Sequence, residues 1–390
     1  MASVSEKQNL LGLDVDALTA LMAKLGGKPF HARQLLKWMH SRGVSDIDAM
    51  TDLSKKLRDK LKQQFVISPP EVVERFISKD GTRKWLLEAG NGQAIEMVYI
   101  PEAKRGTLCI SSQVGCALDC SFCSTGAQGF NRNLNTGEIV SQVWLANHEL
   151  GAYGEDGLVA VDGDDDTDDA EDDSNDELST RVTNVVFMGM GEPLANYKQV
   201  LPALNILTND HAYMLSRRRV TVSTSGLVPQ LKKLGEESNV ALAVSLHAPT
   251  DDLRDQLVPI NRKHPINELL DQCWDYLSET SGRSVTFEYT LIDGVNDKPA
   301  QATKLAALLK GRPAKVNLIP FNPFPGNDFK RSKSKAIRTF RDILHKQDIR
   351  ATVRKTRGDD IDAACGQLAG QVSDRVKVRL GSKQFTVVTA

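Results

Sequence analysis

The feature that most constrains the fold is an alternation of short apolar stretches with longer amphipathic ones, which begins near residue 107. The apolar stretches are rich in β-branched residues and have the length of single strands: TLCIS (107–111), NVVFM (184–188), RVTVST (219–224), VALAVSL (240–246), VTFEYTL (285–291) and KVNLI (315–319). The stretches between them have helical spacing and include residues 136–150, 200–209, 228–235, 266–279 and 300–311. Six β/α units in series predict an α/β fold with a parallel sheet, either open or curled into a partial barrel.

The segments before this core have other patterns. Residues 1–65 are expected to be helical, with one helix in HARQLLKWMHSRG (31–43) and a second helix that Thr51 opens. Several basic residues accompany these helices, which suits either RNA binding or a helical cap that only packs on the core. Residues 70–100 hold three short β-rich segments separated by Asp-Gly and Asn-Gly dipeptides, which predicts a three-stranded meander.

These patterns divide the chain into four expected parts. IRATVRK, near 349–355, predicts one more strand after the core. The parts are a helical domain (1–68), a β-meander extension (69–104), the β/α core (105–348) and a C-terminal strand with a mobile loop (349–390). Residues 155–177 contain thirteen Asp or Glu and no Lys or Arg, which predicts a disordered acidic insertion in the core.

The acidic insertion hides the charge of the rest of the chain. Without its thirteen acids, 49 basic residues face 37 acidic ones, a net charge of +12 instead of −1. A basic body is compatible with a nucleic-acid partner and also with an ordinary solvated surface. No run of about 18 apolar residues occurs, and the first residues lack the basic start and apolar stretch of a secretory signal. We therefore expect a cytoplasmic monomer without a membrane partner.

Three cysteines form the sharpest chemical signal. Cys116-Ala-Leu-Asp-Cys120-Ser-Phe-Cys123 follows the first core strand, so the thiols are expected at a carboxyl strand end, where active sites of such sheets lie. No fourth cysteine or histidine stands nearby, whereas structural zinc takes four protein ligands. A [4Fe–4S] cluster held by three cysteines keeps one iron open for a substrate or cofactor. The alternatives are zinc or an accidental group of buried cysteines.

This cysteine spacing, with an aromatic residue before the last cysteine, resembles the radical S-adenosylmethionine (SAM) superfamily. The resemblance implies a partial (β/α)6 TIM-like barrel, one [4Fe–4S] cluster on Cys116, Cys120 and Cys123, and SAM bound at the open iron. Further segments narrow the resemblance to the RlmN-type adenine-C2 methyltransferases of ribosomal RNA and tRNA. By this resemblance the SAM-binding residues are Gly191 and Glu192 in MGMGEP, Ser223, Ser245, Leu246, His247 and Asn322.

The same resemblance implies a two-stage reaction that uses two SAM molecules per turnover. Cys365 takes a methyl group from the first, and a 5′-deoxyadenosyl radical from the second activates that S-methyl group for addition to adenine C2. Cys109 then attacks the Cys365 sulfur, which releases the product and leaves a disulfide. Glu96 matches the family's acid–base residue, although an outward-facing strand carboxylate is an equal alternative. Cys273, in a predicted helix, is interpreted as a core residue.

The expected substrates are an adenosine in the peptidyl transferase region of 23S ribosomal RNA and the adenosine next to the anticodon in tRNA. An electron donor such as flavodoxin is a further expected partner. Three other functions remain open: an adenine-C8 RNA methyltransferase of the same superfamily, a radical enzyme for a small molecule or peptide, and a non-catalytic iron–sulfur or zinc RNA-binding protein. The candidate RNA-binding surfaces are the N-terminal helices, Arg217–Arg219, and Lys330, Arg331, Lys333 and Lys335.

Overall fold

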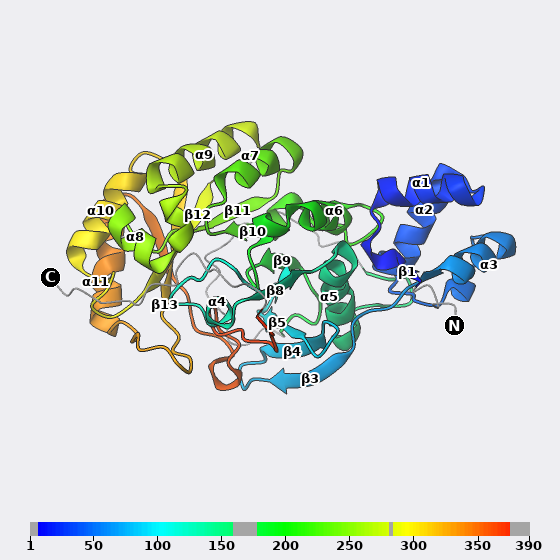
Figure 1. Cartoon of the computed structure of the whole chain (residues 1–390), viewed down its shortest axis with the longest axis horizontal. Helices are drawn as coiled ribbons and strands as arrows, with labels where there is room; N and C mark the ends of the chain where they lie inside the picture. Colours follow the sequence, from blue (N-terminus) through cyan, green and yellow to red (C-terminus); the bar gives the residue numbers. More distant parts are fainter. Residues whose placement is uncertain (1–6, 159–177, 281–283, 375–390) are drawn as a thin grey trace.

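One ten-stranded sheet forms the centre of the protein (Figure 1). The structure, a computed structural model, describes residues 7–158, 178–280 and 284–374. The strand order is β14-β13-β12-β11-β10-β9-β6-β5-β4-β3. The first seven of these are all parallel: β6 (Gly106–Cys109), β9 (Asn184–Phe187), β10 (Val220–Thr224), β11 (Ala241–Ser245), β12 (Val285–Leu291), β13 (Ala314–Pro320) and β14 (Arg350–Val353).

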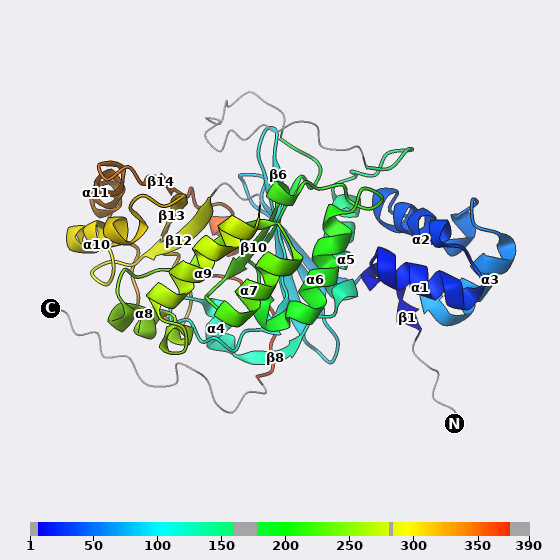
Figure 2. The ribbon, with the colours of Figure 1, turned by 90° about the horizontal axis from the view of Figure 1, so that it is seen from above.

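The parallel strands follow one another in space in the same order as in the chain. Each right-handed crossover therefore steps in one direction and leaves its helix on the same face, which gives a curved, singly wound sheet. Figures 1 and 2 show the connecting helices outside the strands. These helices are α5 (Thr136–Glu149), α6 (Tyr197–Thr208), α7 (Val228–Glu237), α8 (Asp251–Leu257), α9 (Ile266–Glu279), α10 (Pro299–Leu309) and α11 (Ser334–His345). The predicted α/β partial barrel is confirmed, and the strand predicted near 349–355 is present as β14.

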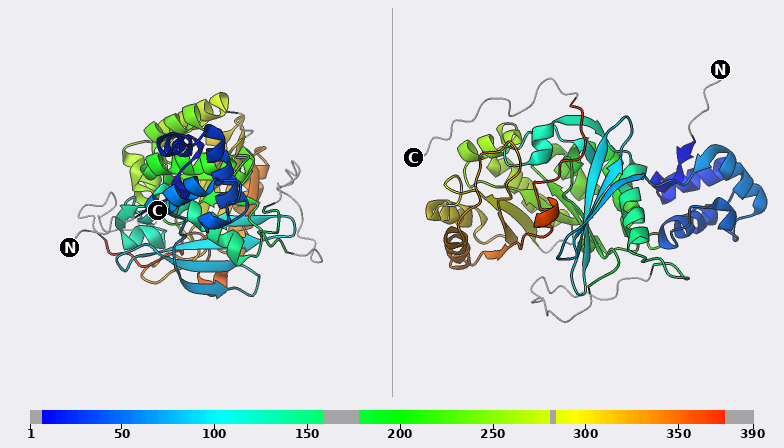
Figure 3. Two further views of the ribbon diagram at one scale, coloured as in Figure 1. Left: turned by 90° about the vertical axis from the view of Figure 1, so that its right-hand side faces the viewer. Right: turned by 90° about the horizontal axis from the view of Figure 1, so that it is seen from below.

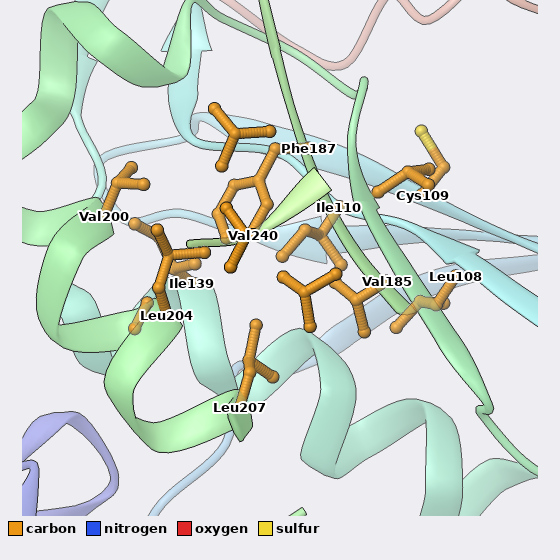
Figure 4. Packing of buried hydrophobic residues seen from close by; sticks show 14 of the residues in the cluster. Leu108, Cys109, Ile110, Ile139, Val185, Phe187, Val200, Leu204, Leu207 and Val240 are labelled. Atoms are coloured by element: carbon orange, nitrogen blue, oxygen red, sulfur yellow. The ribbon is translucent and has the colours of Figure 1, made fainter. Parts of the chain in front are cut away.

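The main core fills the space between the sheet and these helices. Apolar side chains of β6, of Ile110 just after it and of β9 meet those of α5 and α6, which include Ile139 and Leu204 (Figure 4). Cys109 lies at the margin of this cluster, on the side away from Leu204 (Figure 4). Because neighbouring residues of a strand point to opposite faces, Cys109 faces the inside of the barrel rather than the helices.

The predicted β-meander is confirmed and extends the same sheet. Its antiparallel strands are β3 (Val72–Ile77), β4 (Arg83–Glu88) and β5 (Ala94–Pro101), and β5 pairs antiparallel with β6. A small hairpin that the sequence did not predict is formed by β7 (Gln113–Gly115) and β8 (Phe130–Asn133), with the one-turn helix α4 (Ser124–Gln128) between them. This hairpin closes the base of the loop that carries the three clustered cysteines.

The N-terminal residues form a helical module at one end of the molecule (Figures 1 and 3). It contains β1 (Gln8–Asn9), α1 (Val15–Leu25), α2 (Pro29–Leu36), a π-helical turn (Lys37–Ser41), α3 (Lys55–Gln64) and β2 (Phe65–Val66). The expectation that Thr51 opens a helix is wrong. The helix begins at Lys55 because the Ser54 side chain accepts a hydrogen bond from the Leu57 amide, the arrangement of an N-cap.

Two further observations concern membrane-spanning helices and the acidic insertion. Among the described residues, no helix is both long and apolar enough to cross a bilayer. The acidic insertion was predicted to be disordered over residues 155–177. Residues 159–177 lie outside the described ranges, whereas residues 155–158 are described and include the bridge of Gly157 with Gly154. The residues that lead into it pack back on the helical module, where the Leu158 amide donates to the Ser41 carbonyl at 2.6 Å.

Candidate active site at the carboxyl ends of the strands

The three clustered cysteines lie on one loop between β7 and β8. The loop starts where the Cys116 amide donates to the Gly129 carbonyl at 2.7 Å, and it turns where the Cys123 amide donates to the Cys120 carbonyl at 3.1 Å. Asp119 adopts a φ of 55°, in the left-handed region that tight turns require. These bonds fold the chain so that all three thiols line one cavity of about 140 Å³.

A second apolar cluster supports this loop from below. Its buried members come from the segments that follow the parallel strands: Leu118, Ala248, Leu257, Val258, Ile260, Ile292 and Phe321. Cys116, Cys120 and Phe122 are half-buried and pack against it. Phe122 also contacts the His247 ring, with 4.3 Å between the ring centroids. The loop is thus fixed by apolar packing as well as by its hairpin.

Burial of the three thiols disfavours their ionised, thiolate form. Burial raises the pKa of Cys116 to about 12, and burial together with the neighbouring thiols raises that of Cys120 well above its usual value. Hydrogen bonds from the Leu118 amide to Cys116, and from Gly126 and Thr125 to Cys123, act in the opposite direction. A metal centre replaces the proton on each thiol and benefits from the same donors.

These residues fit a cluster of several irons. Within the described part of the chain, no group of three or more His, Cys, Asp or Glu side chains is placed as it would be around one metal ion. In an iron–sulfur cluster each thiolate binds a different iron, so three thiols spread around one cavity suit such a cluster. Cys116, Cys120 and Cys123 are the residues that would hold it.

The MGMGEP segment follows β9 and approaches the cysteine loop closely. Gly191 has a φ of +98°, and a Cβ there would lie 2.5 Å from the Gln113 Cβ, so only glycine fits. The Glu192 carboxylate accepts hydrogen bonds from the amides of Leu194 at 3.1 Å and Ser225 at 2.8 Å. Burial raises its pKa to about 7. A buried carboxylate of this kind is suited to a cationic ligand.

Five of the seven residues predicted to bind SAM line the cavity: Gly191, Glu192, Ser223, Ser245 and His247. The other two lie beside it. Leu246 is fully buried, and Asn322 donates from its side chain to the Cys365 carbonyl at 3.2 Å. His247 accepts a hydrogen bond from the Thr290 amide at 2.9 Å, and burial lowers its pKa to about 3, so the ring is neutral.

Cys365 lines the same cavity, although it is more than 240 residues away from the cysteine loop in the chain. It lies on a segment that leaves β14 and crosses to β5 on the other side of the barrel, where Ala94 pairs with Gln371 (red in the right-hand view of Figure 3). On the way, Gly366 accepts a hydrogen bond from the Ser124 amide at 2.8 Å. Bonds of this kind connect the Cys365 loop to the cysteine loop and to β5, and the predicted mobility of the Cys365 loop stays a prediction.

Cys109 and Cys365 are close enough to interact electrostatically. Burial, reinforced by Cys365, raises the pKa of Cys109 to about 12. Burial also raises the pKa of Cys365, and the Arg354 guanidinium opposes that rise. Both thiols are free in this structure. The fold thus brings together the two cysteines that the sequence predicts to react with one another, while Cys273 is buried in α9 as expected.

Glu96 is neither outward-facing nor in the cavity wall. Its carboxylate is buried, pairs with the Lys84 ammonium at 3.1 Å, and accepts from the Ala369 amide at 2.8 Å. Ala369 follows Cys365 in the crossing segment, so Glu96 supports the loop that carries Cys365. Its acid–base role stays a prediction.

Three charged residues of the site escaped the sequence analysis. Arg354 donates to the Cys365 sulfur at 2.8 Å, Glu288 lines the cavity from β12, and Arg254 is fully buried below the strand ends. Signals existed for two of them. Arg354 stands at the end of a predicted strand, and Glu288 is a carboxylate inside an otherwise apolar strand. Arg254 gives no signal in the sequence.

The predicted RNA-binding surfaces lie at different edges of the sheet. Arg217–Arg219 precede β10, so they lie at the amino ends of the strands, away from the cavity. Lys330 and Arg331 follow β13 and lie at the carboxyl ends, on the side of the cavity. In α3, Lys62 pairs with Asp48, while Lys55 and Lys56 are exposed.

Known proteins resemble the chain over most of its length. Residues 8–67 match the model of the ribosomal RNA large subunit methyltransferase N-terminal domain, and residues 110–306 match that of the radical SAM superfamily. The crystal structure of a radical SAM methyltransferase from Sphaerobacter thermophilus is 44% identical, with a TM-score of 0.80 over 93% of this chain and 99% of that one.

Two more distant structures are also similar. A domain of pyruvate-formate lyase-activating enzyme from Bacteroides vulgatus is 17% identical, with a TM-score of 0.34 over 44% of this chain and 99% of that one. SuiB from Streptococcus suis bound to S-adenosylmethionine is 10% identical, with a TM-score of 0.42 over 88% of this chain and 66% of that one. The TM-scores of both structures are too low for any inference about this chain.

Proposed function

The chain belongs to the radical SAM methyltransferases of the RlmN type, and we propose that it methylates carbon 2 of a specific adenosine in RNA. The proposed targets are the peptidyl transferase region of 23S ribosomal RNA and the adenosine next to the tRNA anticodon. One observation carries this proposal: Cys365 lines the same cavity as Cys116, Cys120 and Cys123. An additional thiol beside a three-cysteine set suits a reaction in which the protein itself carries the methyl group.

The chemistry of the target explains why such a site is needed. Adenine C2 is electron-poor and its hydrogen is poorly acidic, so it does not attack a sulfonium methyl group by displacement. The cluster and SAM, when bound, supply one-electron chemistry that generates a 5′-deoxyadenosyl radical. We propose two SAM molecules per turnover, one as the methyl donor for Cys365 and one as the radical source.

The chain's own residues bind, orient and carry groups in this proposal. Glu192 offers a buried carboxylate to the cofactor's ammonium, and Ser245 and His247 line the cavity wall around it. Cys365 accepts the methyl group as a thiolate and holds it within the cavity. Once the 5′-deoxyadenosyl radical has removed one hydrogen atom from this S-methyl group, the S-methylene would bond to adenine C2 and form a thioether link between protein and RNA.

Product release depends on the second thiol. The C2 hydrogen would leave as a proton, and the Cys109 thiolate would attack the Cys365 sulfur and break its bond to the methylene carbon. That carbon would take up a proton to become the methyl group, the one surplus electron would pass to the redox partner, and a disulfide would remain to be reduced. The influence of Cys365 on the pKa of Cys109 indicates that the two thiols lie near one another, which is compatible with that step. Glu96, held by Lys84, is the proposed acid–base residue near the Cys365 loop.

An RNA substrate suits the surface on the side of the cavity. Lys330, Arg331, Lys333 and Lys335 are exposed in the segment after β13, where they can meet phosphates around a nucleotide that has left its stack. The helical module is a second proposed RNA contact. The proposed electron donor is flavodoxin, and the proposed oligomeric state is a monomer.

Nucleoside analysis tests the proposal. Cluster-loaded protein is incubated without oxygen with ribosomal RNA or tRNA, SAM and a reductant, and the RNA is digested for mass spectrometry. We expect 2-methyladenosine with the wild type and with Cys273→Ala, and none with Cys365→Ala. Formation of 8-methyladenosine would make the chain an adenine-C8 methyltransferase instead, and 2-methyladenosine from Cys365→Ala would refute the methyl-carrying thiol.

A further inference from the structure

We propose that Arg354 is a positioning residue that holds the Cys365 sulfur in the cavity and stabilises its thiolate for methyl transfer. This inference rests on the proposed function and deepens it, because it assigns the group that activates the methyl-carrying thiol. Arg354 was not among the residues that the sequence singled out.

The position of Arg354 is set by the sheet. Its amide donates to the Leu318 carbonyl of β13 at 2.8 Å, which continues the pairing of β13 with β14 to the carboxyl end. From there the guanidinium reaches the Cys365 loop, and Nη1 donates to the Cys365 Sγ at 2.8 Å. A rigid strand end therefore holds a fixed positive charge against a sulfur that sits on an irregular segment.

A buried carboxylate faces the same guanidinium. Glu288 lies on β12, and both of its oxygens accept from the Asn317 side chain, at 3.1 and 3.0 Å. Glu288 and Arg354 attract one another, and the Cys365 sulfur and Glu288 are the leading negative partners of Arg354. The guanidinium thus bonds to the Cys365 thiol and is attracted over a longer range by the Glu288 carboxylate.

Two other groups near Cys365 disfavour its thiolate. Glu288 on β12 and Cys123 on the cysteine loop each oppose a negative charge on the Cys365 sulfur. Burial opposes it as well. Arg354 opposes these influences more than any other group does: its charge and its hydrogen bond both lower the pKa of the Cys365 thiol, so we infer that the thiolate depends mainly on it.

The step that Arg354 assists is an ordinary displacement. A lone pair of the Cys365 thiolate forms a bond to the methyl carbon of a sulfonium donor, and the donor's carbon–sulfur bond breaks with its electron pair staying on the donor sulfur. Cys365 becomes a neutral thioether. Because a thioether is a weaker acceptor than a thiolate, the hold of Arg354 on the sulfur weakens once the methyl group has been transferred.

The experiment measures Cys365 itself, without RNA or SAM. Cluster-loaded protein is exposed to iodoacetamide under oxygen-free conditions across a range of pH, and peptide mass spectrometry follows the alkylation of Cys365 alone. The variants are Arg354→Gln, which removes the charge, and Arg354→Lys, which keeps it. Arg350→Gln is the matched control, because Arg350 is an exposed arginine on the same strand. Iron content and circular dichroism show which variants are folded.

We expect Arg354→Gln to move the midpoint of the rate–pH profile upward by about one pH unit or more. Alkylation at neutral pH then slows about tenfold, because only the thiolate reacts. Arg354→Lys should recover much of this loss, and Arg350→Gln should match the wild type. An unchanged profile in Arg354→Gln, or an equal loss in Arg354→Lys and Arg354→Gln, would overturn the proposal. If Arg354→Gln does not fold, the comparison of Arg354→Lys with the wild type decides. Loss of the bond from Nη1 should raise the midpoint by a fraction of a pH unit even though the charge is kept, and an unchanged midpoint would overturn the proposal.

The outcome is separable from that of the proposed function. The alkylation profile depends on the Arg354–Cys365 contact whatever the RNA target is. A shifted profile in a protein that methylates no adenine would leave the role of Arg354 intact and refute the proposed function. Normal 2-methyladenosine formation by the wild type, together with an unshifted profile in Arg354→Gln, would leave the proposed function intact and refute the role of Arg354.

Discussion

A single buried arginine ties together the strand ends that form the cavity wall. The Arg254 guanidinium donates to the carbonyls of Leu246 at 3.1 Å, Ser225 at 2.7 Å and Ser245 at 3.0 Å, and to the Asn261 side chain at 2.8 Å. It is fully buried. We predict that Arg254→Met, which keeps most of the volume, destabilises the protein by about 3 kcal/mol.

The magnitude follows from two opposing contributions. Four hydrogen bonds from a charged donor contribute about 1.5 kcal/mol each at the lower end of their range, or about 6 kcal/mol together. Burial lowers the pKa of Arg254 to about 10 from 12.5, so removing the charge returns about 3 kcal/mol of desolvation cost. The difference, about 3 kcal/mol, agrees with the cost of breaking other buried charged networks.

Urea unfolding of the oxygen-protected protein measures this change. Arg262→Met is the matched control, because Arg262 is exposed just beyond α8 and should shift the free energy of unfolding by no more than about 0.5 kcal/mol. SAM binding by calorimetry should weaken in Arg254→Met as well, since Ser245 and Ser225 line the cavity. A decrease in the free energy of unfolding of Arg254→Met that is no larger than that of the Arg262→Met control would refute the reasoning.

Other predictions concern the thiols and the junction with the helical module. Cys365→Ala should retain the cluster, seen by iron and sulfide analysis, yet accept no labelled methyl group from SAM. Cys109→Ala should accumulate a covalent RNA–protein adduct on a denaturing gel, and a gel free of it would exclude the resolving role. Because burial raises the pKa of Cys109 to about 12, adduct resolution in the wild type should accelerate about tenfold per pH unit around neutral pH, and a flat profile would exclude thiolate attack. Burial lowers the pKa of His40 to about 3, so its contribution to stability is full above about pH 6.5 and falls by about 2 kcal/mol by about pH 5, as the unfolded chain takes up the proton. Unfolding of His40→Gln at both pH values should lack this loss.

Much of the fold could be predicted because its signals are local. The six core strands and the meander correspond to short segments of high β-propensity that are bounded by turn residues. Tertiary packing favours the same strand conformation in these segments. The helix that follows Thr51 was misplaced because two residues, Thr51 and Ser54, can cap a helix. Ser54 is the N-cap in the structure, because a helix that begins at Lys55 buries Leu57 and Leu61 on one face.

The predicted site is harder to derive from local sequence patterns, because tertiary structure brings together residues that are far apart in the sequence. The three cysteines are close in sequence, so their loop could be anticipated. Cys365 reaches them only because an irregular segment crosses from β14 to β5, and such a segment has no period to detect. Arg354 and Glu288 interact electrostatically across the strands for the same reason, and no spacing in the sequence joins them.

The central claim is that Cys116, Cys120 and Cys123 hold a cluster with one iron left open for SAM. The most direct measurement combines iron, sulfide and zinc analysis of protein purified without oxygen with paramagnetic resonance of the reduced centre, before and after SAM is added. The account predicts about four irons and four sulfides per chain, no stoichiometric zinc, and a spectrum that changes on addition of SAM. Stoichiometric zinc, or a spectrum that SAM leaves unaltered, would contradict it.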